Sequence, residues 1–409
     1  MKQLRALCGA WRAAVLFAAV VIAACCPAVV RAGSGEECTT GIITGAATAD
    51  GHPILWKNRD TLTPSNKVVR VHADPHDYLA LVNAGEPSGR VAFGGLNAAG
   101  FAIINSVAYN LPLLKGELAD LEGHIMAEAL RSCSTVDDFE HYLAANLGPS
   151  LGCQTNFCVI DAHGGAAVFE THNHGYKRLE ASAAPGQCFV NTNFSRSGAA
   201  DEGQGYLRFD RETQLLGSVP KGRLGHDFIL QTVARDLGHT LLHHPERAEW
   251  HRLPADRPTW VFAEHTIDRE FTAWTALIHG VNADEDPSRA TLWVILGEPA
   301  CSIAVPVWVA AGETPPELRD GDEAPIYHEA LRLQHRLRPL PGKEGMQYAD
   351  LRQLDNRAGT GWLPANLKVE RSILDDTKRL LAGAPGPGEL AAFEKSCAAR
   401  ALAALRAIP

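Results

Sequence analysis

The sequence predicts an α+β fold in which runs of strands and runs of helices form separate layers. Strand-favouring segments with clear turn signals follow residue 38, two helical patterns span 116–148, and strands then return. Because strands and helices do not alternate strictly, this order favours a layered α+β architecture over a doubly wound parallel sheet. With 46% hydrophobic and 21% charged residues, the composition is typical of an ordinary globular protein.

The first 32 residues predict a secretory signal peptide. A basic start is followed by an uncharged, mostly aliphatic stretch over 13–30, and the basic residues are Lys2, Arg5 and Arg12. This stretch is barely as long as a membrane-spanning helix requires, which is about 20 apolar residues. We therefore expect a secreted or periplasmic protein without stable membrane insertion.

Two processing sites are compatible with this leader. Small residues at Val30 and Ala32 predict cleavage before Gly33, which would make 33–37 a short propeptide. Alternatively, the segment that ends at Cys25 resembles a bacterial lipoprotein box, and a lipid would then be attached to that cysteine. Either site leaves Cys38 close to the processed terminus.

The remaining elements can be assigned in chain order. The first hairpin is expected over 39–57, with its turn at Asp50-Gly51, and an N-cap at Ser134 or Thr135 begins the second helix. The other predicted elements are strands on either side of 97–100, helices over 116–133 and 134–148, a hairpin over 156–173, a strand over 187–195, helical patterns over about 204–250, strands over 272–281, 290–297 and 303–310, and helices near 366–382 and 388–407.

Charge and cysteine content narrow the function further. The net charge of −9 excludes the basic surface that nucleic-acid binding requires. An exported protein could pair cysteines into as many as three disulfides, whose connectivity the sequence leaves open. The cysteines concerned are Cys133, Cys153, Cys158, Cys188, Cys301 and Cys397.

Cys38 has a chemical role open to it if it becomes the first residue of the mature chain. Its thiol can then attack a carbonyl while its free α-amine accepts the proton. An α-amine has a pKa of about 7.7–8.0, which is close to the pH at which a general base is most effective. The strand expected after Cys38 would hold the nucleophile rigidly.

Several motifs around Cys38 resemble one known family. "CTTG" followed by "ADGHPILWKNRD" resembles the start of the choloylglycine hydrolase and acyl-CoA:6-aminopenicillanic acid acyltransferase group of N-terminal nucleophile hydrolases. The resemblance continues in the family's order through "GGLNAAGFAIINS", "NFCVIDAHGGAAVFE", "VNTNFS" and "YLRFDR", so that it covers roughly residues 38–300.

The resemblance implies a fold and an activity. The fold would be a four-layer αββα sandwich, with a catalytic domain over 38–310 and a helical C-terminal extension over 311–409. The activity would be hydrolysis of a linear amide, or acyl transfer, through a cysteinyl thioester after self-cleavage before Cys38. The substrate would be a small-molecule amide or acyl compound, and no cofactor or metal is implied. Substrate identity and oligomeric state stay open.

The resemblance also implies roles for individual residues. Cys38 would be the nucleophile, and Asp60 would hold its amine. Asn193 would donate to the oxyanion, and Asn105 would be a second polar residue near the acyl group. Arg208 would brace the site.

One position departs from the family pattern. The family has an arginine three residues before the aspartate, and an asparagine follows that arginine. This chain has Lys57 at the arginine position and Asn58 after it, with Arg59 next. Lysine lacks the planar fork of donors that arginine provides. Which of Lys57 and Arg59 supports the site is therefore open.

Three alternatives compete with this interpretation. Gly148–Gly152 matches the GxSxG motif of serine hydrolases around Ser150, but a predicted helix precedes it where a strand is required. The histidines at 239, 243 and 244 have one-turn spacing without the HExxH glutamate, which predicts a solvated helix and not a zinc site. Finally, a secreted binding protein could use the same fold with Cys38 blocked or disulfide-bonded.

Overall fold

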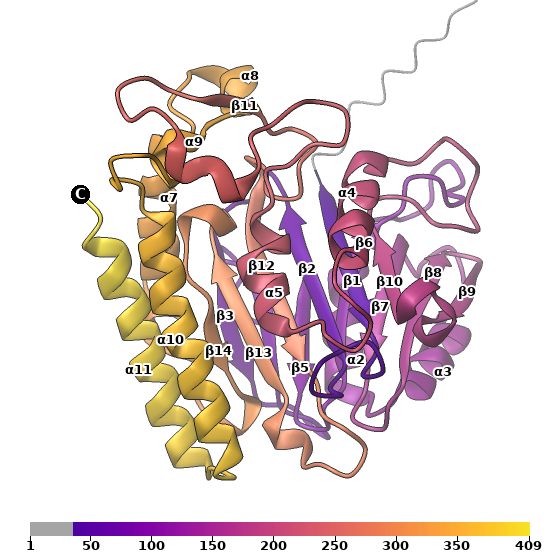
Figure 1. The fold of residues 1–409 in the computed structure, drawn as a ribbon. Coiled ribbons are helices and arrows are strands. Elements are labelled where there is room, and N and C mark those ends of the chain that lie inside the picture. Colours follow the sequence, from indigo (N-terminus) through magenta and orange to yellow (C-terminus); the bar gives the residue numbers. More distant parts are fainter. Residues whose placement is uncertain (1–35) are drawn as a thin grey trace, which may run out of the picture. The chain divides into compact units, whose positions relative to one another are not determined.

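The computed structural model describes residues 36–409, which form one compact unit (Figure 1). The predicted signal peptide, the lipoprotein alternative at Cys25 and residues 33–35 of the predicted propeptide lie outside the described residues. The expected mixture of helices and antiparallel sheets is confirmed. Within 36–409, no helix combines the length and apolarity needed to cross a bilayer.

The larger sheet is a seven-stranded antiparallel meander in which neighbours in sequence are neighbours in space. Two of the predicted hairpins, at 97–100 and 163–165, lie within it, whereas β6 and β7 are joined by a long segment that contains two helices. Its strands are β3 (Asn66–Val71), β4 (Tyr78–Asn83), β5 (Gly94–Asn97), β6 (Ala102–Val107), β7 (Gln154–Ile160), β8 (Ala166–His172) and β9 (Gly175–Glu180).

The second sheet is six-stranded, in the order β10-β1-β2-β12-β13-β14. Its central hairpin pairs β1 with β2 and confirms the hairpin predicted over 39–57. Its strands are β1 (Glu37–Ile43), β2 (Ile54–Asp60), β10 (Cys188–Asn191), β12 (Thr272–His279), β13 (Thr291–Leu296) and β14 (Val305–Val307). A small separate sheet joins β11 (Trp260–Phe262) to β15 (Tyr348–Asp350).

The helices follow the strands in two groups. In the first group, α2 and α3 lie between β6 and β7 in the sequence, and α4 and α5 lie between β10 and β11. The helices of the second group, α6 to α11, follow β14. The helices are α2 (Glu122–Ser132), α3 (Val136–Asn146), α4 (Tyr206–Gly217), α5 (His226–Gln231), α6 (Pro316–Arg319), α7 (Pro325–Leu337), α8 (Gly342–Met346), α9 (Leu351–Leu354), α10 (Leu363–Ala382) and α11 (Pro387–Arg406).

Alternating side chains of the seven-stranded sheet pack into two cores, as the two-residue period of a strand requires. Ile103 and Val159 lie in one buried cluster with Phe139 and other residues of α2 and α3. Ile104 and Cys158 lie in a second cluster, which includes residues of the six-stranded sheet. One face of the seven-stranded sheet is thus covered by helices, and the other shares a core with the second sheet.

The C-terminal helices pack on the six-stranded sheet and alongside one another (Figure 1). Two fully buried ion pairs tie this region to the rest of the unit: Arg235 to Glu370 of α10 at 2.7 Å, and Arg338 to Glu298 at 2.8 Å. Removing one partner would leave a buried charge unpaired, at a cost of about 3–5 kcal/mol. The predicted domain boundary at 310/311 stays a prediction.

Several local expectations are wrong. The first helix begins at Glu122 and not near residue 116, and the helical pattern over 204–250 fails around the histidines. His239 Nδ1 accepts the backbone N–H groups of Leu241 and Leu242 at 3.0 and 3.1 Å, so these groups are capped in a loop and do not continue a helix. The seven described cysteines are free thiols, so the allowed disulfides are not formed.

Candidate active site

Cys38 is the second residue of β1, which lies second from the edge of the six-stranded sheet. β1 pairs with β2 on one side and with β10 on the other, and the Cys38 side chain is buried. Its backbone N–H donates to Asn193 Oδ1 at 2.9 Å. The Glu37–Cys38 peptide bond therefore lies inside a strand with its nitrogen held by a side chain.

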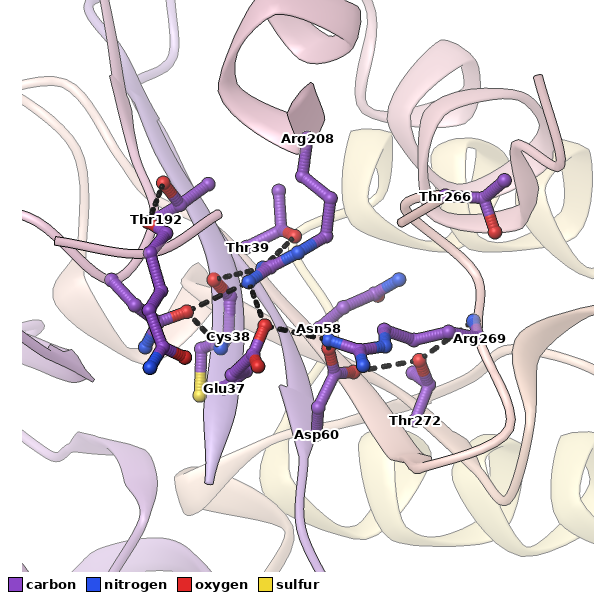
Figure 2. Close-up of polar contacts among 12 residues, drawn as sticks. Glu37, Cys38, Thr39, Asn58, Asp60, Thr192, Arg208, Thr266, Arg269 and Thr272 are labelled. Carbon is purple, nitrogen blue, oxygen red and sulfur yellow. Dashed lines mark hydrogen bonds and ion pairs between the residues drawn. The ribbon is translucent and has the colours of Figure 1, made fainter. Parts of the chain in front are cut away.

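Arg208, on α4, extends its side chain to both Glu37 and Cys38, as Figure 2 shows. Its Nη1 donates to Cys38 O at 2.6 Å and to Thr39 Oγ1 at 3.0 Å. Its Nη2 donates to Asn193 Oδ1 at 2.9 Å and to Glu37 Oε2 at 2.6 Å. The arginine expected to brace the site thus contacts residues on both sides of the predicted cleavage point.

The start of α4 depends on a glycine that lets Arg208 approach. Gly205 has a φ of +79°, which glycine tolerates best. A Cβ at this position would lie 2.7 Å from Arg208 Nη2 and 2.8 Å from Thr192 Cβ. Both the backbone conformation and the available space therefore exclude a larger residue here.

A second arginine, Arg269, reaches Glu37 from the loop before β12 (Figure 2). Its Nη1 lies 2.7 Å from Glu37 Oε2 and 3.6 Å from Asp60 Oδ2. Asn58 helps to hold this loop, because its Nδ2 donates to the Ile267 carbonyl at 3.1 Å. The carboxylate of Glu37 is thus bound by two guanidinium groups that are themselves buried.

Asp60 lies on the same side of the sheet as Glu37. Its Oδ1 accepts from Thr272 Oγ1 at 2.7 Å, and its buried Oδ2 has no hydrogen-bond partner among the described residues. Burial raises the pKa of Asp60 to about 6, although Arg269 and Arg208 act in the opposite direction.

Lys57 and Asn105 lie on the opposite side of β2, between the two sheets. Lys57 Nζ donates to Asn105 Oδ1 at 2.7 Å and to the Phe93 carbonyl at 3.1 Å. Burial raises the pKa of the Cys38 thiol, and the charge of Lys57 is the strongest influence that lowers it. Lys57 is therefore the cation that acts most on the thiol.

Arg59 instead contacts the residue before Glu37. Its Nη1 donates to Asn66 and Asn83, each at 2.8 Å, and its Nη2 lies 3.3 Å from Glu36 Oε1. The Tyr109 hydroxyl donates to the Glu36 carbonyl. The two residues before Cys38 are therefore held on both sides of the sheet.

Of the sequence-predicted site residues, Asn193, Arg208 and Asp60 join Cys38 in one network of hydrogen bonds and ion pairs. Lys57 and Asn105 form a separate pair, and Arg59 contacts Glu36. Two contacts differ from the expected ones. Asn193 faces the Cys38 N–H with its oxygen, while its Nδ2 donates to the Val107 carbonyl at 2.9 Å. Asp60 contacts Thr272 and Arg269, whereas the Cys38 backbone N–H donates to Asn193 and not to Asp60. The expected roles in oxyanion and amine binding stay predictions.

Sequence reasoning missed Arg269, Glu37 and Thr272. Arg269 stands in an Asp-Arg-Glu run directly before an apolar strand, and all three charged residues are buried. Because charged residues are almost never fully buried without partners, such a run beside a predicted strand was a usable signal.

The serine-hydrolase alternative lacks its structural context. Ser150 is exposed in the turn between α3 and β7, so a helix precedes it and a strand follows it. A nucleophile elbow requires the reverse order, strand then helix.

No family profile and no curated protein matches the chain. Among solved structures, it is similar to a variant of conjugated bile acid hydrolase from Clostridium perfringens, with 13% identity over 63% of this chain and 89% of that chain and a TM-score of 0.37. It is also similar to an N-acylethanolamine-hydrolyzing acid amidase ortholog from Caenorhabditis elegans, with 13% identity over 59% and 92% of the two chains and a TM-score of 0.41. Penicillin V acylase from Agrobacterium tumefaciens is 14% identical over 66% of this chain and 86% of that chain, with a TM-score of 0.37.

Proposed function

We propose that this chain is a cysteine N-terminal nucleophile enzyme that matures by cleavage of the Glu37–Cys38 bond and then cleaves linear amides or transfers their acyl group. The observation that carries this proposal is the support around that single bond. Asn193 holds its nitrogen side, Arg208 contacts the residues on both sides, and Arg269 holds the Glu37 carboxylate. Fixing the reacting groups in this way lowers the entropic part of a reaction barrier.

Maturation would use the same groups as catalysis. The Cys38 thiol attacks the Glu37 carbonyl carbon, a C–S bond forms as the C–N bond breaks, and the thiol proton passes to the departing nitrogen. Water then hydrolyses the thioester, which releases Glu37 as a carboxylate and regenerates the thiol. The product carries a free α-amine next to the nucleophile, and this amine can serve as the general base.

Turnover of an external amide would follow the same sequence. The amine accepts the thiol proton, the sulfur attacks the amide carbonyl, and the leaving amine takes the proton as the acyl group is transferred to sulfur. Water or a second amine then releases the acyl group. In this proposal Lys57 favours the thiolate, Asp60 and Asn193 orient the amine, and the Asn193 amide or a nearby backbone N–H stabilises the oxyanion.

The proposed four-layer αββα arrangement is supported by the two cores. The sheets share one core, α2 and α3 cover the outer face of the seven-stranded sheet, and α4, α5, α10 and α11 pack on the six-stranded sheet. The proposed export of the chain rests on its N-terminal sequence alone.

The test is the intact mass and N-terminal sequence of the exported protein beside its Cys38→Ala variant. We expect the wild type to begin at Cys38 and the variant to retain preceding residues, after which simple amides are screened as substrates. If both proteins begin at Gly33, the autoprocessing proposal is rejected. A mature protein whose Cys38 thiol cannot be alkylated would instead favour the non-catalytic binding protein.

A further inference from the structure

A group of ligand-type side chains lies at the other end of the β1–β2 hairpin from Cys38. Asp50 and His52 are in the turn of this hairpin, and His279 ends the neighbouring strand β12. At about 3.3 Å per residue, the length of β1 alone separates this end of the hairpin from Cys38 by more than about 15 Å. The group is therefore independent of the proposed active site.

Three ligand atoms of these residues converge. Asp50 Oδ2 lies 2.9 Å from His279 Nε2 and 3.6 Å from His52 Nδ1, and the ligand atoms of the three residues lie within 4.8 Å of one another. The 2.9 Å contact is a hydrogen bond to the carboxylate, so a metal ion would displace the proton of His279 Nε2. The other carboxylate oxygen, Asp50 Oδ1, accepts the backbone N–H of His52 at 3.2 Å. This bond orients the carboxylate so that Oδ2 faces both imidazoles.

Glu285 sets the tautomer of His52. Its Oε2 lies 2.6 Å from His52 Nε2 and also accepts the backbone N–H of Asn282 at 2.9 Å. Because an ionised carboxylate only accepts hydrogen bonds, Nε2 carries a proton, and the neutral imidazole would present its Nδ1 lone pair toward Asp50 Oδ2. His52 Nδ1 is buried and has no hydrogen-bond partner among the described residues, since 3.6 Å is too long for a hydrogen bond.

We propose that Asp50, His52 and His279 form a binding site for a divalent transition-metal ion, with Zn²⁺ the best match. Two imidazole nitrogens and one carboxylate oxygen are a typical zinc ligand set, and zinc bonds of about 2.0–2.2 Å separate tetrahedral ligand atoms by about 3.3 Å. The observed separations of 2.9 and 3.6 Å bracket this value. The fourth position would be taken by water.

The surroundings of the site support this assignment. Metal-bound histidines usually donate their other ring nitrogen to a carboxylate, which is the contact that Glu285 makes with His52. The His226 ring packs against the His279 ring, with centroids 4.3 Å apart, and against Trp293, with centroids 5.8 Å apart. The buried His52 Nδ1 lies beyond hydrogen-bond distance of Asp50 Oδ2, and a metal ion between the two atoms would bind both.

A metal ion here would link the hairpin turn to the end of β12. These two segments flank β2, whose Ile54 pairs with both Ile43 and His279. Binding only to the folded chain would stabilise it, and at a zinc concentration a hundred times Kd we expect the unfolding temperature to rise by about 3 °C. The ion would have a structural role, separate from the chemistry at Cys38.

The experiment is calorimetric titration of the chelator-treated protein with ZnCl₂ alone, followed by thermal unfolding with and without zinc. We expect one equivalent to bind to the wild type and to Cys38→Ala. His52→Ala and His279→Ala should abolish binding, and Glu285→Gln should weaken it about 10–100-fold. His251→Ala is the matched control, because this exposed histidine lies outside the group, and its binding should be unchanged.

Circular dichroism and the metal-free unfolding temperature show whether each variant is folded. Should a histidine variant not fold, the absorption spectrum of the Co²⁺-substituted wild type decides the matter, since nitrogen and oxygen ligands lack thiolate charge-transfer bands. Thiolate bands would overturn the proposal. So would absence of binding to the wild type, or equal binding by the wild type and folded His279→Ala.

Discussion

Replacing Glu37 by glutamine in a Cys38→Ala background should destabilise the unprocessed protein. Glu37 Oε2 accepts hydrogen bonds from Arg208 at 2.6 Å and from Arg269 at 2.7 Å. The Glu37 side chain is 24% exposed, whereas those of the two arginines are 1% and 5% exposed. Glutamine would leave two buried guanidinium groups beside a neutral acceptor.

The size of the effect follows from these two bonds. A hydrogen bond to a charged group contributes about 1.5–3 kcal/mol, and a neutral acceptor retains part of this, so we expect a loss of about 2–4 kcal/mol in the free energy of unfolding. With an unfolding entropy of about 2.1 cal/mol/K per residue, the unfolding temperature of the unit formed by 36–409 should fall by about 3–5 °C.

The assay is thermal unfolding of Cys38→Ala with and without the substitution at Glu37. Glu36→Gln is the matched control, because Glu36 has one longer ion pair, 3.3 Å from Arg59, and a hydrogen bond from Thr61 Oγ1 that a glutamine oxygen can also accept. Arg59 keeps its bonds to two asparagine side chains, so we expect the free energy of unfolding to change by about 1 kcal/mol or less. Equal effects of the two substitutions, or no effect of Glu37→Gln, would refute the reasoning.

The pH dependence provides a second check on Glu37. Burial raises the pKa of this carboxyl, but Arg208 and Arg269 outweigh burial, so the net pKa is lowered. Its stabilising contribution is therefore complete above the unfolded pKa of about 4.3 and is lost as the pH falls through the lower folded pKa. The difference between the two proteins should shrink in strong acid.

Three further predictions concern the groups around Cys38. Lys57→Met should raise the thiol pKa and slow the alkylation of Cys38 at neutral pH, with Cys188 alkylation as the internal reference; an unchanged rate would exclude the electrostatic role of Lys57. Because burial raises the pKa of Asp60 to about 6, stability from its protonated form is complete below about pH 4 and is lost as the pH rises through about 6. Asp60→Asn in the Cys38→Ala protein should therefore reduce the fall in unfolding temperature between pH 5 and pH 7, and an identical fall would contradict the assignment. Asn193→Ala should slow self-cleavage by about 10²–10³-fold, followed as disappearance of the precursor by mass spectrometry, and processing at the wild-type rate would remove Asn193 from the mechanism.

Local elements that depend on short-range chemistry could be predicted from the sequence alone. Asp50-Gly51 marks the turn of the first hairpin, and Thr135 caps α3 as expected, with its side chain accepting from the Asp138 N–H. These features depend on a few neighbouring residues, so local patterns were sufficient. The motif order also located Cys38, Asn193 and Arg208, which the structure brings into one hydrogen-bonded network.

The charged groups that meet near Cys38 could not be predicted, because their contacts depend on the order of the strands in the sheet. Arg269 and Glu37 are 232 residues apart in the chain, and their contact arises because β12 lies beside β2 in the sheet. The same applies to His279, which reaches the first hairpin by ending a strand that begins far along the sequence. Strand order depends on burial summed over the whole unit, and no local pattern records it. The loop at 239–244 makes the same point, because its helical spacing was overridden by side-chain hydrogen bonds to the backbone.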